Sequence, residues 1–488
     1  MKTILSTVLF FFLFAGSVTA QPVMLSLERT ITIAADSSLE AFRSQNMYLA
    51  GFWQFRTYRA GRLPSLELSL TPAQYYSDIT RRYDSDADID VYRKQQYYYA
   101  YGMLSVEQNF DLLGGKFFLD TDLGYMRNFG ANAYSQYTAV PIRFGYSQDL
   151  LGYNPFKWEC KIEPLKFEKV KREFIYNVEQ ISETATEYFF QLAMAQAEYD
   201  LARDNVASTD TLYRTGEQRY KIASITRADL LTLKLDAVNA RNTLQNADIA
   251  LKRAMFGLAS FLNFDKTTEI RLQLPGKPGE MTISVDEALA KARENNPKFL
   301  NLRQQILEAE QTVDKTRRES LFNASFRASI GFNQVAERFS DVYLDPLRQD
   351  VVSISITIPL IDWGIRKGKY NIARNTLNVT HISTRQEELA LEEDLIMTVG
   401  DFNIRQRMIV SAEEALDLAE TAFSETKQRF IIGKADINSL TLSLNRQQDA
   451  RRNYISALKN YWLSYYKIRK LTLFDFIQRT SLSTLFDL

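Results

Sequence analysis

Strict alternation of apolar and polar residues marks four stretches of the chain. They lie at residues 65–70, 140–147, 324–332 and 353–360. Alternation over about ten residues is typical of a tilted strand that crosses a lipid bilayer with a wet inner face. A soluble sheet with one buried face shows the same pattern, so the alternation by itself leaves both interpretations open.

A second pattern, in which apolar residues recur at steps of three and four, covers much longer regions. It runs over residues 178–206 and 409–430, where many seam positions are Ala or Thr. These steps predict coiled-coil helices, and small seam residues let helices approach closely. Pro164 is the only proline within residues 162–222, and residues 366–431 contain none. A helix of about 60 residues is roughly 90 Å long, so we expect a tube, a stalk or a fibre.

The two halves of the chain repeat each other. Residues 32–46 match residues 282–296 at an offset of 250, and residues 219–223 match residues 429–433 at an offset of 210. Because the offset falls from 250 to 210, the first half carries extra residues between these two matched segments. Each half has the same predicted order, which is a short helix, then strands, then a very long helical hairpin.

The extra residues of the first half contain a further predicted hairpin at about 104–126. Apolar residues alternate on both sides of Leu113-Gly114-Gly115, which has the composition of a turn. The hairpin could extend the wall of a barrel, or lie outside it as a plug or cap. We favour the extension.

The first residues have the layout of a secretory signal peptide. A positive start, Met1-Lys2, precedes an apolar run from Ile4 to about Ala15 and the small-residue site Val18-Thr19-Ala20. A retained anchor is disfavoured because the run is short, and no later run is long enough for a transmembrane helix. Export and the repeat together favour strands that cross a membrane. We predict a signal peptide at 1–20, a first repeat at 21–271, a linker at 272–280, a second repeat at 281–475 and a tail at 476–488.

Composition argues against catalysis and against nucleic-acid binding. The 59 basic and 59 acidic residues balance, so no overall field attracts a nucleic acid. One cysteine, Cys160, excludes an intramolecular disulfide, and one histidine, His381, disfavours a metal site or a Ser-His-Asp triad. The sequence has no phosphate-binding loop, zinc-ligand spacing or nucleophile elbow. We expect no catalytic residue, metal or cofactor, and the chain has no site of its own to hydrolyse ATP.

Each long helix ends at a matched turn. The first turn contains Ile222-Ala223-Ser224, and the second contains Ile432-Gly433-Lys434. Gly433 can adopt the positive φ that a tight connection between helices needs. Thr226 and Asp436 occupy equivalent places, where each can cap the returning helix.

At these turns the sequence resembles the TolC-like outer-membrane factor family, also called outer membrane efflux proteins. That family shows an aromatic residue, a tip like Val-Gly-Leu, a polar residue and an Asp-Val-Leu run. Further similar segments are Pro359-Leu360-Ile361-Asp362-Trp363-Gly364, Leu63-Pro64-Ser65-Leu66, residues 286–289 and Glu294-Asn295-Asn296-Pro297. The resemblance covers nearly the whole mature chain, in order and twice.

The resemblance implies an α+β membrane protein with outer-membrane barrel strands and long coiled-coil helices that form a periplasmic tube. It implies a homotrimer in the outer membrane of a Gram-negative bacterium, in contact with outer-membrane lipid. Each copy would give four strands to a twelve-stranded barrel. A periplasmic adaptor, or membrane fusion protein, and an inner-membrane RND or ABC pump would dock at the tips. The implied function is the passive exit duct of a tripartite efflux or type I secretion system.

The resemblance also implies roles for residues at the two turns. The residues that would contact the adaptor are Ile222, Ala223, Ser224, Ile432, Gly433 and Lys434. The family's gate aspartate maps to Asp229 in the first half and to Ser439 in the second, with Asp436 the nearest carboxylate one turn earlier. The alternative for both aspartates is that they cap helices or face solvent.

A rival class is a structural or adhesive coiled-coil protein of the cell surface. That class explains the long helices, but it explains neither the amphipathic strands nor the duplicated turns. An enzyme is a third class, and no catalytic constellation supports it.

Overall fold

The structure is a computed structural model that describes residues 23–86, 88–129, 133–266 and 268–482. It contains two compact units, each drawn from both sequence repeats. One unit combines the segments up to Tyr48, Lys171–Pro297 and from Ala390 onward, and the other combines Leu49–Val170 with Lys298–Leu389. The predicted signal peptide lies outside the described residues.

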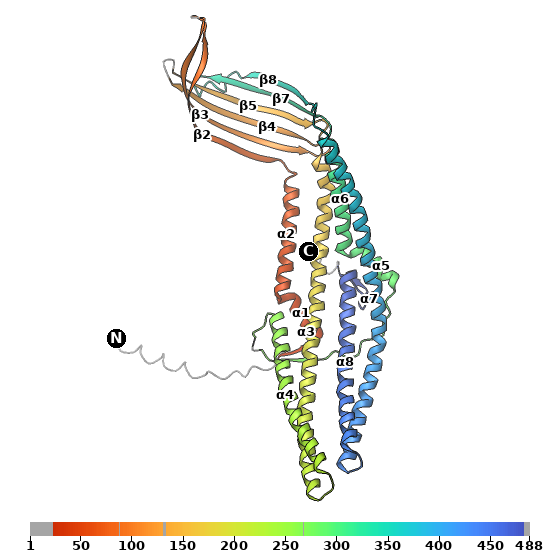
Figure 1. Cartoon of the computed structure of the whole chain (residues 1–488). Coiled ribbons are helices and arrows are strands. Elements are labelled where there is room, and N and C mark those ends of the chain that lie inside the picture. Colours follow the sequence, from red (N-terminus) through yellow and green to blue (C-terminus); the bar gives the residue numbers. More distant parts are fainter. Residues whose placement is uncertain (1–22, 87, 130–132, 267, 483–488) are drawn as a thin grey trace, which may run out of the picture. The chain divides into compact units, whose positions relative to one another are not determined.

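A single antiparallel sheet dominates the second unit (Figure 1). Within the described residues the strand order is β2-β3-β4-β5-β7-β8, so β2 and β8 are the edges. The strands are β2 (Ser65–Asp84), β3 (Ile89–Phe110), β4 (Gly115–Phe129), β5 (Tyr134–Asp149), β7 (Asn323–Ala336) and β8 (Leu347–Thr357). The resemblance implies four strands in each copy, and the structure corrects that number to six.

The two faces of the sheet differ in chemistry, as the alternation predicts. Leu66, Val106, Leu119, Phe144 and Ile330 form one row of paired residues across five neighbouring strands. Four of these apolar side chains are exposed, and Val106 is half-buried. An exposed apolar sheet face of this kind indicates that another apolar surface or medium covers it.

The opposite face is polar and carries buried charge. Asp120 is 7% exposed, and its Oδ1 lies 2.8 Å from Nε of Arg143. Asp122 lies 3.8 Å from Nη2 of the same guanidinium. A charge of this kind is tolerated on a wet face and not on a lipid-facing one.

The predicted extra hairpin is β3–β4, and it is part of the sheet. The turn between its strands contains Gly114, whose φ of 80° is open to glycine at no steric cost. β4 pairs with β5 on its other side. The hairpin therefore extends the sheet, and its place in the wall of a barrel stays a prediction. The sequence analysis did not predict that β2 and β3 would be so long.

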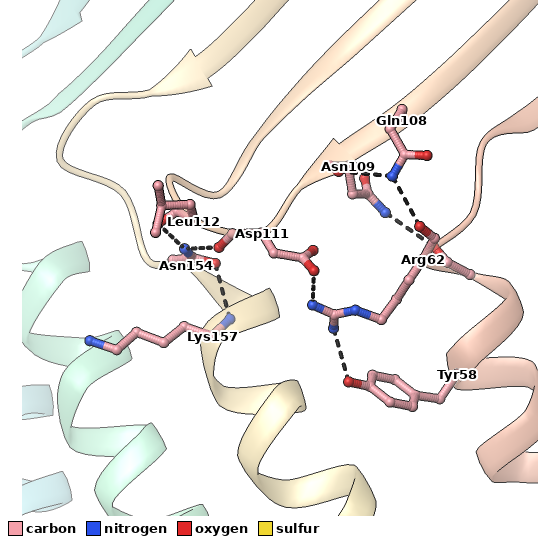
Figure 2. A network of polar contacts seen from close by, with 9 residues as sticks. Tyr58, Arg62, Gln108, Asn109, Asp111, Leu112, Asn154 and Lys157 are labelled. Atoms are coloured by element: carbon pink, nitrogen blue, oxygen red, sulfur yellow. Dashed lines mark hydrogen bonds and ion pairs between the residues drawn. The ribbon is translucent and has the colours of Figure 1, made fainter.

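A polar network holds the turn of this hairpin to the helices beside it (Figure 2). Arg62 forms an ion pair with Asp111 in the turn, and its Nη1 donates a hydrogen bond to the Tyr58 hydroxyl at 3.0 Å. Asn154 donates to the Asp111 carbonyl at 2.9 Å. The Asn154 side chain also accepts from the backbone N–H of Lys157 at 3.2 Å, which is an N-cap contact.

Two long helices, α3 (Pro155–Lys221) and α7 (Ile365–Ile431), begin in the sheet-bearing unit and continue into the first unit. The returning helices are α4 (Arg227–Phe261) and α8 (Ile437–Thr472), so each half contains the expected helical hairpin. Shorter helices are α1 (Leu27–Ser37), α2 (Leu39–Ala60), α5 (Val285–Asn295) and α6 (Pro297–Glu319). No helix in the part of the chain that the structure describes is long and apolar enough to span a membrane.

The predicted seam over residues 178–206 contributes to a buried core in the first unit. Ile181, Ala185 and Leu192 of α3 are almost completely buried, and they belong to one apolar cluster with Leu258 and Leu262 from the α4 end. Small residues at the seam allow this close contact. Strand β1 (Val23–Ser26) pairs in parallel with β6 (Ile270–Gln273) next to the cluster.

Buried ion pairs connect the C-terminal end of α8 to α3. Nη2 of Arg469 lies 2.9 Å from Glu179, and its Nη1 lies 3.1 Å from Asp475 in β9 (Phe474–Asp475), which pairs with β10 (Thr480–Ser481). The Tyr465 hydroxyl donates to Asp475 at 2.7 Å. Burial raises the pKa of Glu179, and the nearby Arg469 acts against that shift.

Candidate functional site

The two helical hairpins end in the same backbone motif. In the first, Ser224 N–H donates to the Arg219 carbonyl at 2.8 Å, and Ala223 N–H donates to Tyr220 at 3.0 Å. In the second, Lys434 N–H donates to Arg429 at 2.8 Å, and Gly433 N–H donates to Phe430 at 3.0 Å. Paired bonds of these spans define a Schellman motif, which satisfies the last carbonyls of a helix.

The left-handed position of each motif carries a different residue. Ala223 has φ of 54° and Gly433 has φ of 78°. Glycine takes this conformation freely, whereas alanine brings its Cβ too close to the following carbonyl. The prediction of positive φ at Gly433 is confirmed, and the first turn adopts it despite its side chain.

Side-chain caps begin both returning helices. Thr226 Oγ1 accepts from Asp229 N–H at 3.1 Å, and the Asp229 carboxylate accepts from Thr226 N–H at 3.0 Å, so the two residues form a capping box. Asp436 accepts from Ser439 N–H at 2.7 Å. The predicted capping by Thr226 and Asp436 is confirmed.

These contacts stabilise the charged forms of both aspartates. Hydrogen bonds from the Thr226 hydroxyl and backbone lower the pKa of Asp229. Hydrogen bonds from Ser439 lower the pKa of Asp436 in the same way. Both carboxylates are therefore anionic at neutral pH, which a capping role and a gating role each require.

The structure brings the two turns together at one cleft of about 270 Å³. Asp229 and Asp436 both line this cleft, and so does Arg219. Arg219 Nη2 donates to the carbonyls of Phe430 and Ile431, and its guanidinium lies 5.5 Å from the Phe430 ring centre. The sequence analysis missed Arg219 as a site residue. The signal that could have identified Arg219 is its position in the matched turn sequence, where it is equivalent to Arg429.

The predicted docking residues lie at the extreme of each hairpin and are exposed. Ile222 is 75% exposed and Ile432 is 65% exposed. Exposed branched apolar residues at the same place on two hairpins make a surface suited to a protein partner. No cluster of His, Cys, Asp and Glu in the described residues could hold a metal ion.

Comparison with protein families gives one match, which covers residues 288–472. The matching family is described as outer membrane efflux protein. Comparison with curated proteins gives no match. The family match confirms the resemblance for the second half of the chain.

Solved structures of bacterial membrane proteins have a similar fold over most of this chain. VceC of Vibrio cholerae has a TM-score of 0.64 at 14% identity, with 91% of this chain and 95% of that chain covered. The Campylobacter jejuni CmeC channel gives 0.65 at 12%, covering 91% and 85%. A membrane protein of Pseudomonas aeruginosa gives 0.63 at 13%, covering 93% and 91%. At these identities the likeness shows the fold, which is the predicted combination of long helices and a sheet.

Proposed function

Since residues 288–472 match the outer membrane efflux family and the whole fold is that of outer-membrane channels, we propose that this chain forms an exit duct. The duct crosses the outer membrane as a β-barrel and continues into the periplasm as a helical tube. It is a passive conduit of a tripartite efflux or type I secretion system.

One observation carries the proposal. A single chain combines a sheet that exposes apolar side chains on one face with two helical hairpins that end in matched turns. Lipid would cover the apolar face of the sheet. The long helices would continue the duct away from that lipid. A coiled-coil adhesin would need the helices and would have no use for the sheet.

A trimer supplies the closure that one chain lacks. The main sheet of the described residues has six strands, and bacterial membrane barrels begin at about eight. The chain must therefore associate before its sheet can surround a pore. Three copies would form the duct, as in the family that this sequence resembles.

The hairpin tips are the proposed docking points for a periplasmic adaptor. The exposed Ile222 and Ile432 would provide apolar contact, and Ala223, Ser224, Gly433 and Lys434 would complete the tip surface. The adaptor would connect the duct to an inner-membrane RND or ABC pump.

Asp229 and Asp436 are the proposed gate carboxylates, with Ser439 as the residue that orients Asp436. Their shared cleft and their lowered pKa values support this role, because a ring of anions near the pore axis would select cations.

Planar-bilayer recording of the protein purified from outer membranes tests the duct. We expect discrete conductance steps and a mass in detergent of three copies. A chain that reaches the cell surface, promotes adhesion and never conducts would support the adhesive alternative.

A further inference from the structure

We propose that the barrel of this duct has eighteen strands, six from each of three copies, and closes by pairing β2 of one copy with β8 of the next. This inference rests on the proposed function. It differs from the twelve-stranded barrel that the family resemblance implies.

The two edges of the sheet are complementary in direction. Every neighbouring pair in the sheet is antiparallel, and the number of strands in one copy is even. β2 and β8 therefore run in opposite directions, so β2 of one copy meets β8 of another as an antiparallel pair. β2 follows helix α2 and β8 precedes helix α7, so Ser65 and Thr357 lie at the same end of the sheet.

The two edges also agree in which side chains face outward. Near the helix-bearing end, the even-numbered residues 66–70 of β2 and 352–356 of β8 are apolar and exposed, and Leu68 and Ile354 are each 62% exposed. Odd-numbered residues such as Ser69 and Ser353 lie on the polar face. An antiparallel register that places Leu68 beside Ile354 continues both faces without a break. Within the described residues each edge strand pairs on one side only, and backbone groups cannot remain unpaired in hydrocarbon.

The extra hairpin cannot be left out of the wall at low cost. β3 pairs with β4 continuously from Gln96 with Phe129 to Phe110 with Gly115. A twelve-stranded barrel without this hairpin would consist of β2, β5, β7 and β8, so β2 would lose its pairs with β3 and β5 would lose its pairs with β4. It would also separate the turn at Asp111 from β2, although Arg62 immediately before β2 is ion-paired to that turn.

The wider barrel has a consequence for cargo. Barrel diameter grows roughly linearly with strand number, and barrels of about 16–18 strands enclose an aqueous channel. The outer-membrane part of this duct would therefore be about half again as wide as a twelve-stranded one. β2 and β3 also continue past the end of β4, because β3 residues 89–95 pair with β2 alone. This end of the hairpin would project beyond the wall.

Cysteine cross-linking of the full chain in outer membranes tests the closure. In a Cys160→Ser background, Ser69→Cys in β2 is combined in turn with cysteines at the odd-numbered β8 residues Val351, Ser353, Ser355 and Thr357. Oxidation should give disulfide-linked dimers and trimers for one register, strongest near Ser353. The matched control replaces Ser69→Cys by Lys116→Cys in β4, on the same polar face, and should give no link between copies.

Three results would overturn the inference. A trimer in which Lys116→Cys links to β8 of another copy has a barrel that closes through β4, with β2 and β3 outside the wall. A trimer in which Ser69→Cys links to none of the four β8 cysteines does not close through β2. In both cases the duct stands and the eighteen strands fail. A stable monomer in detergent would instead overturn the proposed function itself.

Discussion

Arg219 of the first hairpin donates hydrogen bonds to the carbonyls of Phe430 and Ile431 in the second, at 3.3 and 3.2 Å. Its guanidinium also lies over the Phe430 ring, which is buried. Arg429 holds the equivalent place in the second hairpin, so a symmetric motif produces an asymmetric contact. This contact joins the two tips within one chain.

Replacing Arg219 by alanine should loosen the tips. The loss of two hydrogen bonds and a ring contact at a partly exposed site should cost about 0.5–1.5 kcal/mol locally. Hydrogen exchange of the amides around Phe430 should become faster, and resting conductance should rise. Arg429→Ala is the matched control, with a smaller expected effect. Equal effects of the two variants would show that Arg219 has no special role.

Substitutions at the two left-handed turn positions should change the stability of the turns in opposite directions. Gly433→Val should strain the turn by about 1–2 kcal/mol, and Ala223→Gly should relieve a similar strain. Export should fall for Gly433→Val while the protein still reaches the outer membrane. Thermal melting followed by circular dichroism and an efflux assay measure the two effects. Normal export by Gly433→Val would remove the second tip from the docking surface.

Asp229 can be tested as a gate residue separately from its role as a cap. Asp229→Asn removes the charge and keeps an oxygen that can accept the Thr226 hydrogen bonds, whereas Asp229→Ala removes both. A gating carboxylate predicts weaker cation selectivity and weaker block by multivalent cations in both variants. Asp436→Asn should behave similarly if the second carboxylate also faces the pore. Wild-type selectivity and block in Asp229→Asn would assign this aspartate to capping alone.

The assignment of the apolar sheet face to lipid predicts a difference between neighbouring positions. Leu68→Arg should destabilise the membrane-inserted protein by about 2–4 kcal/mol if residue 68 lies near the bilayer midplane. Ser69→Arg, on the polar face, should be tolerated. Urea unfolding in lipid vesicles measures both. Equal tolerance of the two arginines would mean that lipid does not cover the apolar face.

The charge cluster at the end of α8 predicts a pH-dependent loss of stability. Arg469→Met leaves Glu179 and Asp475 buried without their cation, at a cost of about 3–5 kcal/mol. Burial already raises the pKa of Glu179 above its unfolded value, and loss of Arg469 raises it further. A raised carboxyl pKa favours the folded state at low pH, and this contribution is lost as pH rises through the folded pKa. The variant should therefore lose less melting temperature at pH 5 than at pH 8, relative to the unchanged protein. Glu179→Gln in the same background should reduce the difference between the two pH values, and an unchanged difference would exclude Glu179 as its source.

The sequence by itself determined the local elements, because their causes are local. A period of two predicted the strands around Leu68 and Ile354, and a seam of small residues predicted the core around Ala185. Gly433 and Thr226 predicted the tip and its cap from the backbone preferences of single residues. Repetition of the same order in both halves supported the resemblance.

Only the tertiary structure decided which elements meet, because those contacts join residues far apart in the chain. The hairpin at 104–126 was visible in the sequence, but its place between β2 and β5 depends on long-range pairing. Residues 97–101 hid the length of β3, because tyrosines on both faces break the alternation. The bond from Arg219 to Phe430 spans 211 positions and that from Arg469 to Glu179 spans 290. No periodicity or motif encodes such pairs, since they form only when the folded backbone brings distant helices to hydrogen-bonding distance.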